Sequence, residues 1–267
     1  MAVQTIALIG VGRMGQALAT GWLRGRSRPN LILVDPSPSP LAEAMAEEEG
    51  LPINPAPTPV DIAVLAVKPQ IFNMAASDMT GWVGPDTLVL SIMAGIRLNQ
   101  LASTFGTERV IRAMPNTPGA IGKGVSVLSA SDATAKKDVT LATRLLRPLG
   151  KVEGPVAEPS ISAVTGVSGS GPAYVFLLVE ALAEAGEAAG LSKELARTLA
   201  RETLVGSARL LESTGEPAEE LRKAVTSKGG TTEAALDVLM RGDGMPSLLR
   251  EAVRAAAERE RNLASGN

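Results

Sequence analysis

Two short glycine-containing segments of this 267-residue chain have the composition of anion-binding sites. The first is Gly10-Val11-Gly12-Arg13-Met14-Gly15, which follows an apolar run at residues 5–9 and precedes a helix-like stretch from Gln16. A strand, a glycine turn and a helix in this order are typical of a dinucleotide-binding site, where the turn admits the pyrophosphate and the helix N-terminus faces its charge. A plain structural turn is the alternative interpretation of these glycines.

The second segment is Ser227-Lys228-Gly229-Gly230-Thr231-Thr232, ahead of a helix-like stretch at residues 233–240. A Gly-Gly turn with free N–H groups at a helix N-terminus is a natural site for a carboxylate. The alternative is that Thr231 or Thr232 is an ordinary N-cap. One site for a pyrophosphate and one for a carboxylate favour a reductase of a small acid.

The chain contains neither cysteine nor histidine. These absences exclude disulfides and thiolate chemistry, and they remove the usual general base and the usual zinc ligand. We expect no metal site. We also exclude zinc-dependent alcohol dehydrogenases, aldehyde dehydrogenases with a catalytic cysteine and hydroxyacid dehydrogenases that rely on histidine. Acid–base chemistry here must use Lys, Asp, Glu or a hydroxyl group.

Charge and hydropathy indicate a soluble globular protein. The net charge of −2 provides no basic surface for nucleic acid or an anionic membrane. No apolar stretch of about 18–20 residues is free of Gly, Ser and Pro, so we expect no transmembrane helix. The first residues lead into a strand without a secretory pattern. We therefore expect a cytoplasmic location.

The first 155 residues alternate strand-like and helix-like runs, which predicts an α/β fold with a Rossmann-type, doubly wound and mostly parallel sheet. The strand-like runs are apolar throughout, as expected for strands covered on both faces. They occupy residues 5–9, 31–34, 61–67, 87–92, 110–114 and 124–128, and residues 132–147 look helical.

Ligands of an open parallel sheet bind beyond the carboxyl ends of its strands. The residues that follow the predicted strands are therefore candidates for cofactor contact: Asp35, Lys68, Pro69, Met93, Ala94, Gly95, Pro115 and Asn116. Asp35 lies 20 residues after Gly15, where an acid can accept a hydrogen bond from the adenosine ribose and disfavour a 2′-phosphate. This favours NADH, although Arg13, Ser37 and Ser39 are close enough in sequence to hold a phosphate. A turn former before Pro36 is the alternative role of Asp35, and a solvated surface position is that of Lys68.

Beyond residue 155 helical spacing dominates, which predicts two domains, a dinucleotide-binding domain at 1–155 and an all-α domain at 156–267. Residues 172–189 are apolar almost all round. A helix without a polar face must be buried on all sides, and a helical domain of this size has little interior to enclose it. We therefore expect a partner subunit to cover it, the alternative being the central helix of a monomeric bundle.

Five motifs occur in order along the chain: Gly10-x-Gly12-x-Met14-Gly15, Ala66-Val67-Lys68-Pro69, Arg112-x-Met114-Pro115-Asn116-x-Pro118, Ser168-Gly-Ser-Gly-Pro-Ala-Tyr174 and Val225-Thr-Ser-Lys-Gly-Gly-Thr-Thr232. Together they resemble the pyrroline-5-carboxylate reductases, which catalyse the last step of proline biosynthesis. The resemblance spans essentially the whole chain. Two departures are Lys228, where many members have proline, and Asp35, which speaks against strict NADPH preference.

The resemblance implies a Rossmann domain followed by a helical dimerisation domain, with homodimers able to assemble into rings. It implies NADPH or NADH as cofactor, a cyclic imino acid as substrate, and Val67 among the cofactor contacts. Backbone groups of Gly229, Gly230 and Thr231, next to Ser227, would hold the substrate carboxylate. The hydroxyl of Thr232 would lie at the ring nitrogen, as proton donor or as an orienting group. The dihydronicotinamide would lie over residues 93–95, near Asn116.

Other dehydrogenase families lack support in the residues. The catalytic Lys and Asn of β-hydroxyacid dehydrogenases are replaced by Val175 and Val179. The Tyr-x-x-x-Lys pair of short-chain dehydrogenases fails because Leu178 follows Tyr174 at that spacing. The remaining alternatives are a reductase of a related cyclic imine and a non-enzymatic NAD(P)-sensing oligomer, although a sensor has no need of a second anion site.

Overall fold

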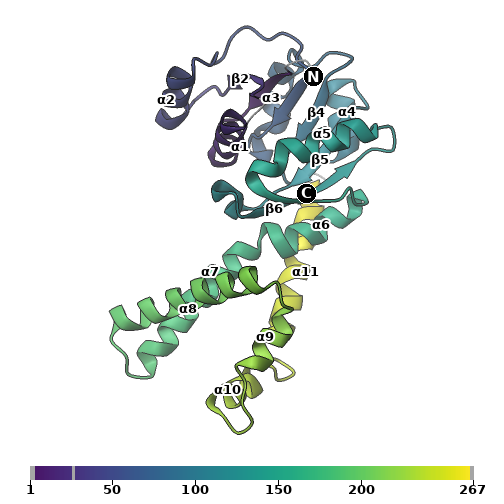
Figure 1. The fold of residues 1–267 in the computed structure, drawn as a ribbon. Coiled ribbons are helices and arrows are strands. Elements are labelled where there is room, and N and C mark those ends of the chain that lie inside the picture. The colour runs from purple at the N-terminus through teal and green to yellow at the C-terminus, as the bar shows by residue number, and fades with distance from the viewer. Residues whose placement is uncertain (1–3, 26–27, 265–267) are drawn as a thin grey trace. The chain divides into compact units, whose positions relative to one another are not determined.

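The computed structural model describes residues 4–25 and 28–264, which form two compact units. One unit runs to Ser170 and takes in the chain again from Ala255, and the other is Gly171–Arg254. The first unit contains a seven-stranded sheet in the order β2-β1-β3-β4-β5-β6-β7 (Figure 1). Its strands are β1 (Thr5–Ile9), β2 (Asn30–Val34), β3 (Ile62–Leu65), β4 (Leu88–Ser91), β5 (Val110–Met114), β6 (Gly124–Ala130) and β7 (Gly150–Glu153).

The sheet is parallel except for the pairing of β5 with β6, which is antiparallel. β1 pairs with β2 on one side and with β3 on the other, so the direction of winding reverses at β1. In such sheets ligands bind beyond the strand ends at this reversal point. All four residues of β3 and of β4 are buried, which explains why these strands are apolar without alternation.

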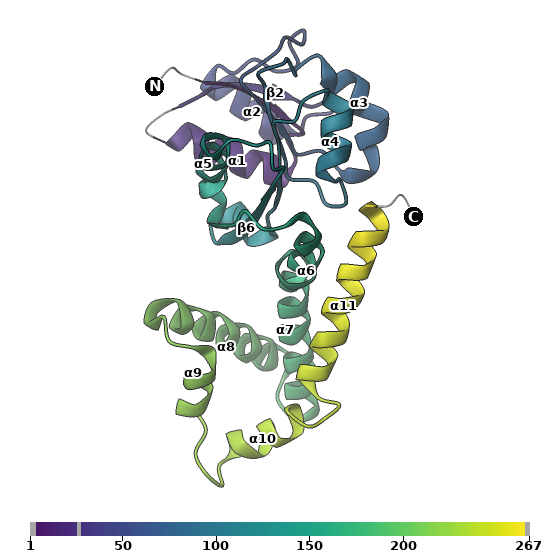
Figure 2. The same ribbon diagram turned by 90° about the vertical axis from the view of Figure 1, so that its right-hand side faces the viewer.

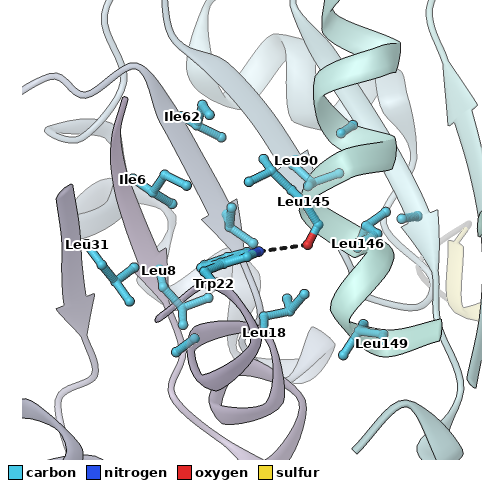
Figure 3. Close-up of a cluster of buried hydrophobic side chains, with 14 of the residues drawn as sticks. Ile6, Leu8, Leu18, Trp22, Leu31, Ile62, Leu90, Leu145, Leu146 and Leu149 are labelled. Atoms are coloured by element: carbon cyan, nitrogen blue, oxygen red, sulfur yellow. Dashed lines mark hydrogen bonds between the residues drawn. The ribbon is translucent and has the colours of Figure 1, made fainter. Parts of the chain in front are cut away.

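Helices cover both faces of the sheet, α1 (Arg13–Arg24) and α5 (Lys136–Leu146) on one, α3 (Phe72–Thr80) and α4 (Leu98–Phe105) on the other (Figure 2). Each face has its own apolar cluster. Trp22 belongs to the first, where its indole N–H donates to the Leu145 carbonyl at 2.7 Å (Figure 3). Trp82 lies in the second, on the opposite face, and both indoles are buried.

Several further helical segments complete the first unit. They are α2 (Pro40–Glu49), the short 3-10 turns Pro69–Ile71, Thr117–Ile121, Arg147–Leu149 and Glu158–Ser160, α6 (Ile161–Val164) and a π-helical turn at Thr165–Gly169. The domain boundary predicted at residue 155 precedes the last three of these. The sequence pattern does not predict β7, because Val152 is its one apolar side chain.

The second unit is helical. It contains α7 (Gly171–Ala188), α8 (Lys193–Thr214), α9 (Ala218–Ala224), α10 (Thr231–Leu239) and the start of α11 (Met245–Ala264), whose end belongs to the first unit. α7 and α8 pack together, and a methyl group at Gly186 would lie 3.1 Å from Ala196 Cβ.

The apolar centre of α7 is exposed within the single chain. Phe176 and Leu177 are 60% and 63% exposed, and Val175, Leu178 and Leu182 are also exposed. The helical stretch Glu158–Ala188 is long and apolar enough to cross a membrane by length and composition alone, although it contains Gly, Ser and Pro residues. This test does not distinguish a membrane span from a helix that packs against protein. Because these five side chains are exposed, the described part of the chain does not enclose them within a helical bundle.

Candidate functional site

The glycine turn between β1 and α1 is shaped by close backbone contact. Gly10 has a φ of +96°, and a methyl group there would lie 2.6 Å from the carbonyl carbon of Ala66. A methyl group at Gly15 would lie 2.3 Å from the Gly10 carbonyl oxygen. Both positions therefore require glycine for the fold itself, which holds the turn against the end of β3 at Ala66 and Val67.

Gly12 is different, because nothing in the protein requires it to be glycine. Its backbone is extended, with φ −73° and ψ −173°, and an added Cβ would meet no atom within 4 Å. Gly12 is exposed and is the N-cap of α1, followed by the exposed Arg13 and the half-buried Met14. The first amides of a helix have no intrahelical partner and carry partial positive charge. The open space beside Gly12 and these amides fit a pyrophosphate.

Asp35 lies at the end of β2, beside the glycine turn. Its Oδ2 accepts a hydrogen bond from the Val11 amide at 2.8 Å, and its Oδ1 accepts one from the Ser37 amide at 3.0 Å. Asn54, which has a φ of +50°, exchanges two hydrogen bonds with the backbone of Asp35. A carboxylate oxygen has two lone pairs, so each oxygen keeps an acceptor site for a ribose hydroxyl.

The other predicted cofactor contacts also lie at the carboxyl ends of strands. Lys68 and Pro69 follow β3 at the start of a 3-10 turn, with the Lys68 side chain exposed. Ala94 and Gly95 follow β4, and Gly95 has a φ of +71°. Asn116 follows β5, and its carboxamide oxygen accepts a hydrogen bond from the Val125 amide at 2.9 Å. The carboxamide NH2 is therefore what Asn116 can offer a ligand.

The π-helical turn Thr165–Gly169 packs against the end of β5. The Ser170 amide donates to the Thr165 carbonyl at 2.8 Å, and a methyl group at Gly169 would lie 2.7 Å from Met114 Cε. The Met114 side chain would have to move to admit a side chain at position 169. π-turns inside helices occur frequently at functional sites.

Sequence reasoning does not single out a buried charge cluster beneath the same edge of the sheet. The Glu260 carboxylate of α11 pairs with Arg112 of β5 and accepts hydrogen bonds from the Ser162 hydroxyl and the Gly95 amide. Burial raises the pKa of Glu260, but the bond from Ser162 and the charge of Arg112 outweigh this effect and hold that pKa below its ordinary value. Arg112, Ser162 and Glu260 line a cleft of about 160 Å³.

The second predicted segment, residues 227–232, lies in the second unit, at the start of α10. Gly229 has a φ of +71°, and its amide donates to the carboxylate of Glu233 at 2.6 Å. The Gly230 amide donates to the Ser227 carbonyl at 3.0 Å. Gly230 is the N-cap, so Thr231 and Thr232 are the first helical residues rather than caps. A carboxylate already occupies one amide of this turn.

In the structure the predicted cofactor contacts thus lie at the carboxyl ends of neighbouring strands. The predicted substrate contacts lie in one turn. Among residues 4–25 and 28–264, no group of three or more acidic side chains has the arrangement of a metal site.

Two family models match different parts of the chain. A family model described as pyrroline-5-carboxylate reductase dimerisation matches residues 158–263, and one described as NADP oxidoreductase, coenzyme F420-dependent, matches residues 5–95. The pyrroline-5-carboxylate reductase of Pisum sativum is 37% identical over 97% of this chain and 96% of its own length. That of Escherichia coli is 37% identical over 97% of both chains.

Solved structures give the same result. A pyrroline-5-carboxylate reductase from Coxiella burnetii superimposes with a TM-score of 0.88 at 33% identity, over 98% of this chain and 99% of that one. The Plasmodium falciparum pyrroline carboxylate reductase, solved with NADP bound, superimposes with a TM-score of 0.80 at 27% identity over 99% of both chains. With relatives of this identity covering nearly its full length, the chain belongs to the pyrroline-5-carboxylate reductase family.

Proposed function

We propose that this protein reduces 1-pyrroline-5-carboxylate to L-proline with NADH or NADPH as the hydride donor. The observation that carries the proposal is the full-length similarity to pyrroline-5-carboxylate reductases, joined to a glycine turn with the open approach that a dinucleotide needs. The sheet and glycine turn alone are shared by proteins of many activities, so the substrate is inferred from the family.

The residues along the edge of the sheet bind the cofactor. The amides at the start of α1 hold the pyrophosphate beside Gly12, and Val67, Lys68 and Pro69 contact it from the end of β3. Asp35 accepts a hydrogen bond from the adenosine ribose, which favours NADH over NADPH because its carboxylate repels a 2′-phosphate. Residues 93–95, with Asn116 nearby, would hold the nicotinamide when the cofactor is bound.

The turn at residues 227–232 binds the substrate. The amides of Thr231 and Thr232, at the start of α10, hold the carboxylate, and Gly229 joins them once Glu233 releases its amide. Thr232 is the proposed catalytic residue, with its hydroxyl at the ring nitrogen, where it donates a proton or orients the ring.

The chemistry suits a chain without histidine. The bound dihydronicotinamide supplies a hydride to the carbon of the C=N bond, and the ring nitrogen takes a proton. A cyclic imine is basic enough to be protonated readily, and the iminium is a good hydride acceptor. The protein mainly has to hold two reactants in register, which contributes several kcal/mol by proximity.

The family match covers a dimerisation domain, and we propose that the exposed apolar side chains of α7 pack against a second copy of the chain. Phe176 and Leu177 are the most exposed of them, and burying such side chains contributes roughly 1.5–3 kcal/mol each. Dimers of this kind can assemble further into rings. Such packing accounts for the apolar stretch without a membrane, in keeping with a soluble enzyme of the cytoplasm.

The test is oxidation of NADH and of NADPH, followed by absorbance, with and without pyrroline-5-carboxylate. We expect substrate-dependent oxidation by the wild type and by Thr232→Ser, which retains a hydroxyl. Thr232→Ala should lose turnover while it binds NADH normally. Cofactor binding without turnover of the wild type would contradict the reductase and favour an NAD(P) sensor. Turnover of the six-membered imine alone would indicate a related imine reductase.

A further inference from the structure

The segment that joins β4 to α4 is tied down at two backbone amides by two carboxylates. The Gly95 amide donates to Glu260, near the end of α11. The Leu98 amide donates to Glu158 Oε1 at 2.6 Å. Both bonds have charged acceptors, which makes them about twice as strong as neutral ones. Two carboxylates from elsewhere in the chain thus hold this segment in place.

Arg112 holds both carboxylates in place. It projects from β5, where its backbone is in register with Ser91 at the end of β4. Its guanidinium pairs with Glu260, and its Nη1 lies 3.6 Å from Glu158 Oε1. Ser162 donates to the second oxygen of Glu260. One arginine therefore interacts with both carboxylates that bind the backbone of this segment.

The cluster is built for position rather than for stability alone. The side chains of Arg112 and Glu260 are both 3% exposed, so both charges are desolvated. The Nε of Arg112 has no hydrogen-bond partner, which costs further free energy. Apolar residues of similar volume often hold two elements together equally well or better. A buried ion pair with an unpaired donor therefore stabilises the packing of α11 less than apolar side chains would. This points to a role for the ion pair other than stability.

The backbone at Gly95 is held in one conformation by its surroundings. A φ of +71° excludes ordinary side chains there, and a methyl group would lie 3.1 Å from Leu263 Cβ. The last turn of α11 thus packs directly on Gly95, while Glu260 holds its amide. Residues 93–95 have little freedom to shift without breaking these contacts.

We propose that Glu260 and Arg112 are positioning residues, which act through the Gly95 amide to hold residues 93–95 as the surface against which the nicotinamide ring lies. The inference rests on the proposed function, which places the nicotinamide there. Neither side chain touches the cofactor in this scheme. The adenosine and pyrophosphate sites, formed by the glycine turn and Asp35, are independent of the cluster.

Binding of NADH and of ADP-ribose, each by titration calorimetry, separates the two regions, because ADP-ribose lacks the nicotinamide. The test variant is Glu260→Ala, and Glu260→Gln retains an acceptor for the Gly95 amide without the charge. Glu258→Ala is the matched control, since Glu258 is an exposed glutamate on the same helix. We expect Glu260→Ala to raise the Kd of NADH about tenfold, roughly the loss of one hydrogen bond, and to leave the Kd of ADP-ribose within about twofold. Glu260→Gln should recover part of the loss, and Glu258→Ala should change neither Kd.

An equal rise in both Kd values, or a change in neither, would overturn the proposal and leave the cluster as an anchor of α11. If Glu260→Ala does not fold, the same comparison is made with Glu260→Gln, whose NADH Kd must still rise relative to that of ADP-ribose. Turnover of pyrroline-5-carboxylate by the wild type is measured separately. Its absence would count against the proposed function, whereas the ratio of the two Kd values would still decide the inference.

Discussion

Gly12 offers a substitution that separates cofactor binding from folding. Its φ of −73° and ψ of −173° are open to alanine, and the added Cβ would meet no protein atom within 4 Å. Gly12→Ala therefore costs the folded state no contact. A glycine replaced by alanine in an allowed conformation stabilises a protein by about 0.4–1 kcal/mol through the unfolded state. Alanine is a poorer N-cap than glycine, which opposes this gain at the start of α1, so the Tm should change little.

The loss should appear in dinucleotide affinity instead. The methyl group would occupy the space beside the first amides of α1, where a phosphate oxygen would otherwise approach. Keeping that oxygen away removes at least one hydrogen bond to a charged group, worth about 1.5–3 kcal/mol. A loss of this size corresponds to a rise of about 10- to 150-fold in the Kd of NADH.

The assay combines titration of NADH with thermal unfolding, and Gly15→Ala provides the contrast. A methyl group at Gly15 would lie 2.3 Å from the Gly10 carbonyl oxygen, so that variant should lose Tm as well as binding. Wild-type affinity in folded Gly12→Ala would refute the placement of the pyrophosphate. A fall in its Tm as large as that of Gly15→Ala would refute the packing argument.

Three further substitutions test other parts of the site. Asp35→Asn should lower the ratio of the NADPH Kd to the NADH Kd about tenfold, since the charge that repels a 2′-phosphate is gone while an acceptor for the Val11 amide remains; an unchanged ratio would deny Asp35 a role in cofactor choice. Glu233→Gln should lower the KM for pyrroline-5-carboxylate about threefold at constant kcat, because a neutral group competes less well for the Gly229 amide; a raised KM in steady-state kinetics would mean that Glu233 supports the turn. If the wild type is a dimer as proposed, Leu177→Glu should shift it towards monomer in light scattering, and an unchanged mass would contradict packing through α7.

The strands with long apolar runs are predictable from the sequence. The bounds expected for residues 5–9 and 110–114 are those of β1 and β5, because most side chains on both faces of these strands are apolar. β7 escapes prediction because it lies at the edge of the sheet, where one apolar residue among charged ones suffices. β7 is a strand because it pairs with β6, and a pairing between distant segments leaves no local sequence pattern.

Some residues of the candidate site are likewise predictable from the sequence, and others are not. The candidate contacts Asp35, Lys68 and Asn116 follow from the rule that ligands bind beyond strand ends, which needs only the positions of the strands. Glu260 does not, because it lies in the run Glu258-Arg259-Glu260-Arg261, and such a charged run is typical of a solvent-exposed helix face. Its burial depends on Arg112, 148 residues earlier in the chain.

The two tryptophans, both buried in the first unit on opposite faces of its sheet, give the protein a built-in optical label. The sequence contains no third tryptophan, so the helical unit Gly171–Arg254 contributes no indole emission. Tryptophan fluorescence, excited at a wavelength that tyrosine does not absorb, therefore follows the unit that contains the sheet alone, whereas far-ultraviolet circular dichroism is dominated by helices of both units. Transitions that differ between the two signals would reveal the units melting separately, and coincident ones would show that they melt together.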